Sequence, residues 1–116
     1  MHPRRGDVYL VDFEPARAGE ASKERPAIVV TNNSANINGS SVVVIPLSGN
    51  TERVYPFQVF LPANRTELRD DSKAQTELIR SVSKERLMKR LTHIPEDLML
   101  EVDSSVLTHL GLGSVR

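Results

Sequence analysis

Up to residue 82 the chain is built from short apolar segments, each separated from the next by polar, turn-forming residues. Four of these segments span residues 8–13, 27–31, 42–47 and 57–61, and a fifth lies within residues 74–82. Runs of four to eight residues bounded by Gly, Pro, Asn and Asp are typical of β-strands. Short strands at this spacing indicate a small, strongly bent sheet or barrel.

Near the C-terminus the apolar residues change to a helical period. Pro95 suits the first position of a helix, and Glu96 and Asp97 place acid in its first turn. Apolar residues then recur at spacings of three and four: Leu98, Met99, Val102, Val106 and Leu110. Gly111 fits the position just past the helix end. We therefore expect one α+β domain over residues 1–116, an antiparallel sheet with an amphipathic helix packed on it.

Composition limits the class of protein and its partners. Lys plus Arg equals Asp plus Glu, 15 each in 116 residues, and a protein that coats nucleic acid non-specifically needs a basic excess. The chain has no Cys, so disulfides and zinc–thiolate sites are excluded, and the three His residues have no metal-binding spacing. No N-terminal signal segment or membrane span is apparent. We expect a cytoplasmic protein without a metal, cofactor or membrane partner.

A charged loop ends in Arg25 and Pro26, directly before the second predicted strand. Proline fixes its own φ and favours an extended backbone at the preceding residue, and it is tolerated at the first residue of a strand. Arg25 should therefore lie at the lip of the sheet on a stiff support. A solvated loop arginine beside a strand-starting proline is the plainer interpretation of the same residues.

The register of the second and third strands gives Arg25 a neighbour. If the two strands pair antiparallel across the Asn-rich turn at residues 32–40, Ile28 lies opposite Ile45. The same register brings Arg25 opposite Ser48, just past the ends of the pair. Opposed residues in such a ladder lie about 4.5–5.5 Å apart. A guanidinium and a hydroxyl should thus meet at one end of the sheet.

These two groups, with the carboxylate of Glu20 on the preceding loop, suit phosphate chemistry. Arginine offers bidentate donors to a phosphate and a serine hydroxyl adds one more, which together can stabilise a pentacoordinate phosphorane without a metal. Glu20 could accept a proton or orient the other groups, although acidic residues in surface loops commonly have no role. Such a site fits RNA cleavage in which the substrate's own 2′-OH attacks.

Three further cations are candidates for RNA contacts: Lys23, Arg53 and Arg80. Lys23 shares the loop with Glu20, and Arg53 follows the third strand. For both, ordinary surface charge explains the residue equally well. Arg80 could instead form a structural ion pair with Glu77.

The order and spacing of several motifs resemble the MazF/PemK family of toxin endoribonucleases, the mRNA interferases of bacterial toxin–antitoxin pairs. The resemblance covers nearly the whole chain and is carried by Arg5-Gly6-Asp7-Val8-Tyr9, by Gly19-Glu20 with Arg25-Pro26-Ala27-Ile28, by Val44-Ile45-Pro46-Leu47-Ser48, by Tyr55-Pro56-Phe57, by Glu77-Leu78-Ile79-Arg80 and by the helix up to Leu110-Gly111-Leu112.

The resemblance implies an SH3-like barrel and a homodimer that binds single-stranded RNA across its interface. It also implies metal-independent cleavage that leaves a 2′,3′-cyclic phosphate. The family's catalytic arginine falls on Arg25, its catalytic threonine on Ser48 and its loop acid on Glu20. By the resemblance Arg25 transfers the proton and holds the scissile phosphate, while Ser48 adds a hydrogen bond; because an arginine is a poor base, charge stabilisation is the alternative role of Arg25. Its implied inhibitor is a cognate antitoxin with a disordered acidic tail, and operator DNA is bound only through the antitoxin complex.

Two departures from the family pattern stand out. Ser48 replaces the usual threonine, which keeps the hydroxyl but loses the methyl that stiffens χ1. Leu78 replaces a frequent glutamine and removes a polar group that could read RNA. The alternative is a CcdB-like, non-enzymatic toxin of the same fold that poisons DNA gyrase, and a weaker one is an inactive regulatory homologue. The pair of Arg25 and Ser48 favours the nuclease.

Overall fold

The computed structural model describes residues 2–13 and 24–112. Its strands are β1 (Asp7–Asp12), β2 (Glu24–Val29), β3 (Ser41–Ser48), β4 (Val59–Leu61), β5 (Ser72–Ala74), β6 (Arg80–Ser83) and β7 (Leu87–His93). Its helices are α1 (Asn33–Asn38), α2 (Ala63–Thr66) and α3 (Glu96–His109), with 3-10 turns η1 (Thr76–Leu78) and η2 (Lys84–Arg86). No helix of the described residues has the length and apolarity needed to cross a membrane.

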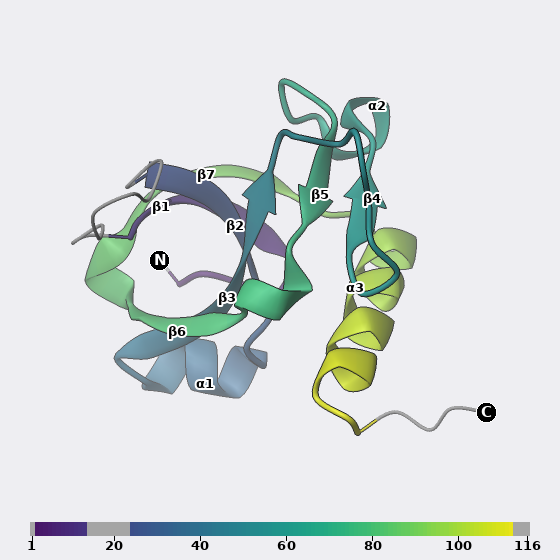
Figure 1. Ribbon diagram of the computed structural model, residues 1–116. Helices are drawn as coiled ribbons and strands as arrows, with labels where there is room; N and C mark the ends of the chain where they lie inside the picture. The colour runs from purple at the N-terminus through teal and green to yellow at the C-terminus, as the bar shows by residue number, and fades with distance from the viewer. Residues whose placement is uncertain (1, 14–23, 113–116) are drawn as a thin grey trace.

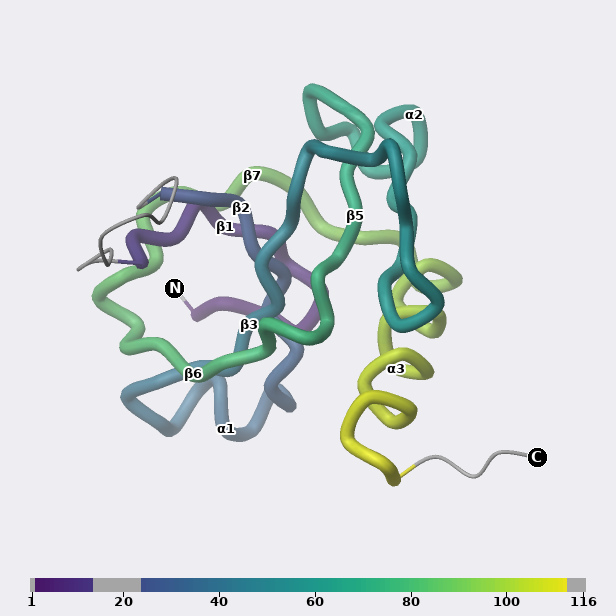
Figure 2. Tube along the Cα trace, viewed as in Figure 1, coloured from purple at the N-terminus to yellow at the C-terminus, as the bar shows by residue number. Residues whose placement is uncertain are grey.

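All strand pairs are antiparallel, in the order β4-β5-β3-β2-β1-β7, with β6 also paired to β3. The sheet curls strongly, so that β1, β2, β3, β6 and β7 surround one half of the molecule (Figure 1). The trace in Figure 2 shows β4 and β5 beside α3 in the other half. The expected α+β class, with a bent sheet and a C-terminal helix, is confirmed.

Strand alternation gives the sheet two apolar faces and hence two cores. Ile28 and Ile45 lie in the core that α3 covers with Leu98 and Val102. On the opposite face, inside the curl, the second core contains the following residues: Val11, Ala27, Val29, Val42, Val44 and Val82. Because successive side chains point to opposite faces, odd-numbered residues of β2 face the curl and even-numbered ones face α3.

The sequence-based element list needs three corrections. The fifth predicted strand is two strands, β5 and β6, separated by the η1 turn. The predicted turn at residues 32–40 contains α1. Asn32 is its N-cap, because the Asn32 side chain accepts a hydrogen bond from the Ala35 N–H at 2.9 Å. The sequence does not predict β7, because Met88 to Leu91 show no two-residue alternation of apolar and polar side chains. In the structure all four of these residues are exposed.

The last turn of α3 and the residue that follows agree with the prediction. Gly111 has φ +73°, the left-handed conformation that the position after a helix favours. Pro95 lies one residue earlier than expected, as the N-cap rather than the first helical residue. Buried side chains of α3 follow the predicted stripe at Leu98, Met99 and Val102.

A buried carboxylate joins the beginning of β1 to the end of β7. Asp7 is 1% exposed and accepts hydrogen bonds from the Arg4 N–H at 2.8 Å, from Arg90 Nε at 3.2 Å and from His93 Nδ1 at 2.8 Å. Burial raises the pKa of Asp7, but the hydrogen bonds from His93, Arg4 and Arg90 lower it more, so its pKa falls below the ordinary 3.8.

We expect Asp7→Asn to lower the free energy of unfolding by about 2 kcal/mol at pH 7, because several hydrogen bonds to a buried charge are weakened together. A group whose folded pKa is depressed stabilises the fold above its unfolded pKa and loses this contribution as pH falls through the folded value. Urea titrations should therefore show a constant difference between wild type and variant above about pH 5, shrinking below about pH 4. A difference that does not change with pH would contradict this assignment.

Candidate active site at the ends of β2 and β3

The observed register of β2 and β3 is the predicted one. Ala27 pairs with Pro46, Ile28 with Ile45 and Val29 with Val44. Arg25 lies two residues before Ala27, and Ser48 lies two residues after Pro46. Side chains two apart share a face, so the side chains of Arg25 and Ser48 belong to the same face of the sheet.

The Arg25 guanidinium is held by neutral groups. One NH2 donates to the Leu47 carbonyl at 3.1 Å and also to Gln75 Oε1. Gln75 is itself fixed, because its N–H donates to the Pro46 carbonyl at 2.9 Å. Partial burial lowers the pKa of Arg25, although a guanidinium stays protonated in proteins. No carboxylate among the described residues pairs with Arg25, so its charge is available to an anion.

Ser48 is the last residue of β3 and is half-buried. Its Oγ accepts a hydrogen bond from the Asn50 N–H at 3.1 Å, which leaves the hydroxyl hydrogen to donate elsewhere. Ser48 directly follows Leu47, whose carbonyl binds Arg25. A Cβ added at Gly49 would meet no atom within 4 Å, so the space beside Ser48 is open.

The same face carries polar groups that the sequence did not single out. Lys73 of β5 pairs directly with Ser48, and Gln75 follows two residues later. In the segments that precede β4 and follow β5, Gln58 Nε2 donates to Glu77 Oε2 at 2.9 Å. The other oxygen of that carboxylate, Oε1, is buried and has no hydrogen-bond partner among the described residues.

The other predicted residues are placed as follows. The Arg53 guanidinium carbon lies 5.3 Å from the centre of the Tyr55 ring, near the site. Arg80 does not pair with Glu77; its guanidinium carbon lies 5.2 Å from the Phe13 ring centre instead. Glu20 and Lys23 fall outside the described residues.

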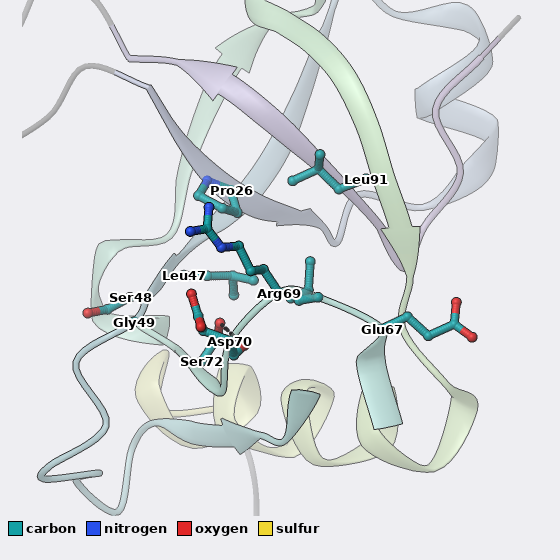
Figure 3. A pocket seen from close by; sticks show the side chains of 10 residues that line it. Pro26, Leu47, Ser48, Gly49, Glu67, Arg69, Asp70, Ser72 and Leu91 are labelled. Atoms are coloured by element: carbon teal, nitrogen blue, oxygen red, sulfur yellow. Dashed lines mark hydrogen bonds between the residues drawn. The ribbon is translucent and has the colours of Figure 1, made fainter. Parts of the chain in front are cut away.

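A cavity of about 410 Å³ opens on the opposite face of the sheet end. Figure 3 shows Pro26, Arg69 and Leu91 directed into it, whereas the Ser48 side chain points away. This agrees with strand alternation, which places Pro26 and Arg25 on opposite faces. Ser48 and Gly49 also line this cavity, so it adjoins the end of β3 that carries the site, whereas Arg25 is not among its lining residues.

Comparisons with known proteins match this arrangement over almost the full chain. Residues 4–110 match the family described as PemK-like, MazF-like toxin of type II toxin–antitoxin system. Endoribonuclease MazF9 of Mycobacterium tuberculosis is 40% identical over 96% of this chain and 98% of its own.

Two solved structures share the fold over almost the whole chain. One is a mycobacterial endoribonuclease in complex with its cognate antitoxin, with TM-score 0.81 and 25% identity over 97% of this chain and 99% of that one. The other is MazF from Deinococcus radiodurans, with TM-score 0.80 and 25% identity over 96% and 98%. The chain therefore belongs to the PemK-like, MazF-like toxins of type II toxin–antitoxin systems.

Proposed function

We propose that this protein is a sequence-specific endoribonuclease that cleaves single-stranded RNA, principally mRNA, as the toxin of a toxin–antitoxin pair. The substrate's 2′-OH attacks the adjacent phosphorus without a metal. The bond from phosphorus to the 5′-oxygen breaks, that oxygen leaves as a hydroxyl after taking a proton from water, and a 2′,3′-cyclic phosphate remains. The observation that carries the proposal is the Arg25 guanidinium beside Ser48, bound only by a carbonyl and an amide among the described residues.

In this mechanism Arg25 stabilises the charge that develops on the phosphorane. Its partners, Leu47 O and Gln75 Oε1, orient the guanidinium without neutralising it. A preorganised donor in a partly desolvated site costs no reorganisation when the charge forms. A guanidinium is a poor base, so we assign the proton of the attacking 2′-OH to the Glu20 carboxylate.

Ser48 would donate its hydroxyl hydrogen to a non-bridging phosphate oxygen. The hydrogen bond from the Asn50 N–H holds Ser48 Oγ in place and uses one of its lone pairs. The hydroxyl hydrogen is then available for a hydrogen bond to the substrate. Serine thereby replaces threonine with the same donor and a less restricted χ1.

The proposed RNA contacts, homodimer and antitoxin follow from the charges of particular side chains and from the family. Lys23, Arg53 and Arg80 contact RNA phosphates or bases, and a homodimer joins two such surfaces into one groove. A cognate antitoxin inhibits by laying an acidic tail over these cations. An antitoxin partner is supported by the mycobacterial endoribonuclease solved in complex with its cognate antitoxin. Operator DNA is contacted only through that complex. The protein acts in the cytoplasm, where its substrate is made, and single-stranded RNA rather than DNA is cut because DNA lacks the 2′-OH.

The first test is cleavage of single-stranded RNA in EDTA. We expect wild type to cut RNA with or without EDTA and to leave DNA of the same sequence intact. Arg25→Ala should slow cleavage about 10²–10³-fold, because a transition-state donor is lost, and Arg25→Lys should restore only part of the rate. Intact RNA together with trapped gyrase–DNA complexes would contradict the nuclease and favour the CcdB-like alternative.

Ser48 gives a second test with a built-in control. Ser48→Ala should lower kcat about tenfold, the value of one hydrogen bond to a charged group, while the affinity for RNA changes little. Ser48→Thr keeps the hydroxyl and restricts χ1, so we expect activity equal to or above wild type. Equal rates for the alanine and threonine variants would remove Ser48 from the mechanism.

A further inference from the structure

Lys73 is a buried lysine whose charge has no carboxylate partner among the described residues. It is 7% exposed and lies in β5, directly opposite Ser48. Lysine is almost never buried unless paired, because an ammonium taken out of water without compensation is costly. A hydrophobic residue would fill this sheet position at lower cost. The ammonium therefore needs an explanation.

The contacts of the ammonium all lie on the segment that follows Ser48. Lys73 Nζ donates to the Arg53 carbonyl at 2.7 Å and lies 5.8 Å from the centre of the Tyr55 ring. The segment from residue 49 to residue 58 is not a strand or a helix. Lys73 thus ties the middle of an irregular loop to the strand that pairs with Ser48.

The tied segment presents a short stack of flat groups. Tyr55 and Phe57 are parallel, with ring centres 5.4 Å apart and an interplanar angle of 4°. The Arg53 guanidinium lies 5.3 Å from the Tyr55 ring centre, and its NH1 donates to the Tyr55 hydroxyl at 3.3 Å. Arg53 is exposed and Tyr55 is 41% exposed. Unpaired RNA bases stack on tyrosine rings and on guanidinium planes.

We propose that Lys73 is a positioning residue, which fixes Arg53 and Tyr55 beside Ser48 as a stacking subsite for one unpaired RNA base. The ligand is a nucleotide next to the scissile phosphate. The proposal rests on the proposed endoribonuclease function and adds a binding subsite to it. Lys73 is also a second cationic residue next to Ser48, on the β5 side where Arg25 is on the β2 side, in a chain whose net charge is zero.

Lys73→Met tests the role, because methionine keeps an unbranched apolar stem and removes only the ammonium. We expect KM for RNA to rise about tenfold while kcat stays within about twofold, since the loss is in binding of the neighbouring base. Lys89→Met, an exposed lysine on β7, is the matched control and should leave both constants unchanged. Tyr55→Phe should behave as wild type and Tyr55→Ala as Lys73→Met.

The combination of Lys73→Met and Tyr55→Ala separates positioning from a general loss of stability. If Lys73 acts through Tyr55, the double variant has the KM of Tyr55→Ala alone. Multiplied effects, or a KM for Lys73→Met equal to that of Lys89→Met, would overturn the proposal. If Lys73→Met fails to fold, Tyr55→Ala tests the subsite instead, because the Tyr55 ring is exposed and its loss should not unfold the protein. A raised KM for Tyr55→Ala supports the subsite, and an unchanged KM overturns it.

A fluorescent probe distinguishes failure of the stacking subsite from failure of the proposed nuclease function. RNA carrying 2-aminopurine beside the cleaved bond, with a 2′-deoxy sugar at that bond to prevent cleavage, should lose fluorescence on binding wild type and regain it with Tyr55→Ala. Cleavage by wild type without quenching would overturn the subsite and leave the nuclease intact. Absence of cleavage would overturn the nuclease, and quenching that requires Tyr55 would still support the subsite.

Discussion

The structure depends on a change of partner in the middle of β3. Along one edge, Ser41 to Val44 pair with β6, whereas Leu47 and Ser48 pair with β5; the other edge pairs with β2. Proline has no N–H to give to either neighbour, so the ladder is weakest where the partners change. Its carbonyl binds the Gln75 N–H, which brings the residue after β5 against the β2 end. Arg25, Ser48 and Gln75 meet because β3 is shared in this way.

The positions of Arg25 and Ser48 could be predicted from the sequence, because the geometry of paired strands determines them. Ile28 and Ile45 lie in apolar runs with sharp limits, so a slip of one residue would have moved both side chains out of the core. Register then placed Arg25 and Ser48 on one face. The contributions of Lys73 and Gln75 have no local signal, because they reach the site through the pairing of β5 with the end of β3.

The face of the sheet on which a side chain lies determines which groups that side chain can contact. Arg25 and Pro26 are adjacent in sequence, yet one side chain binds Gln75 and the other lines the cavity on the opposite face. The aromatic and cationic loop after Ser48 is held by Lys73, whose backbone pairs with Ser48. Leu78, the apolar departure from the family pattern, is 42% exposed at the end of η1.

The bond between Asp7 and His93 spans 86 positions of the chain. The Ile94 N–H also donates to the Gly6 carbonyl at 2.9 Å, so β1 gains its second neighbour only from residues near the other end. Contacts of such long separation are slow to form. A nascent chain on the ribosome therefore cannot complete its sheet until β7 has emerged, and a truncated translation product would lack the β1–β7 pair that flanks β2 and its Arg25.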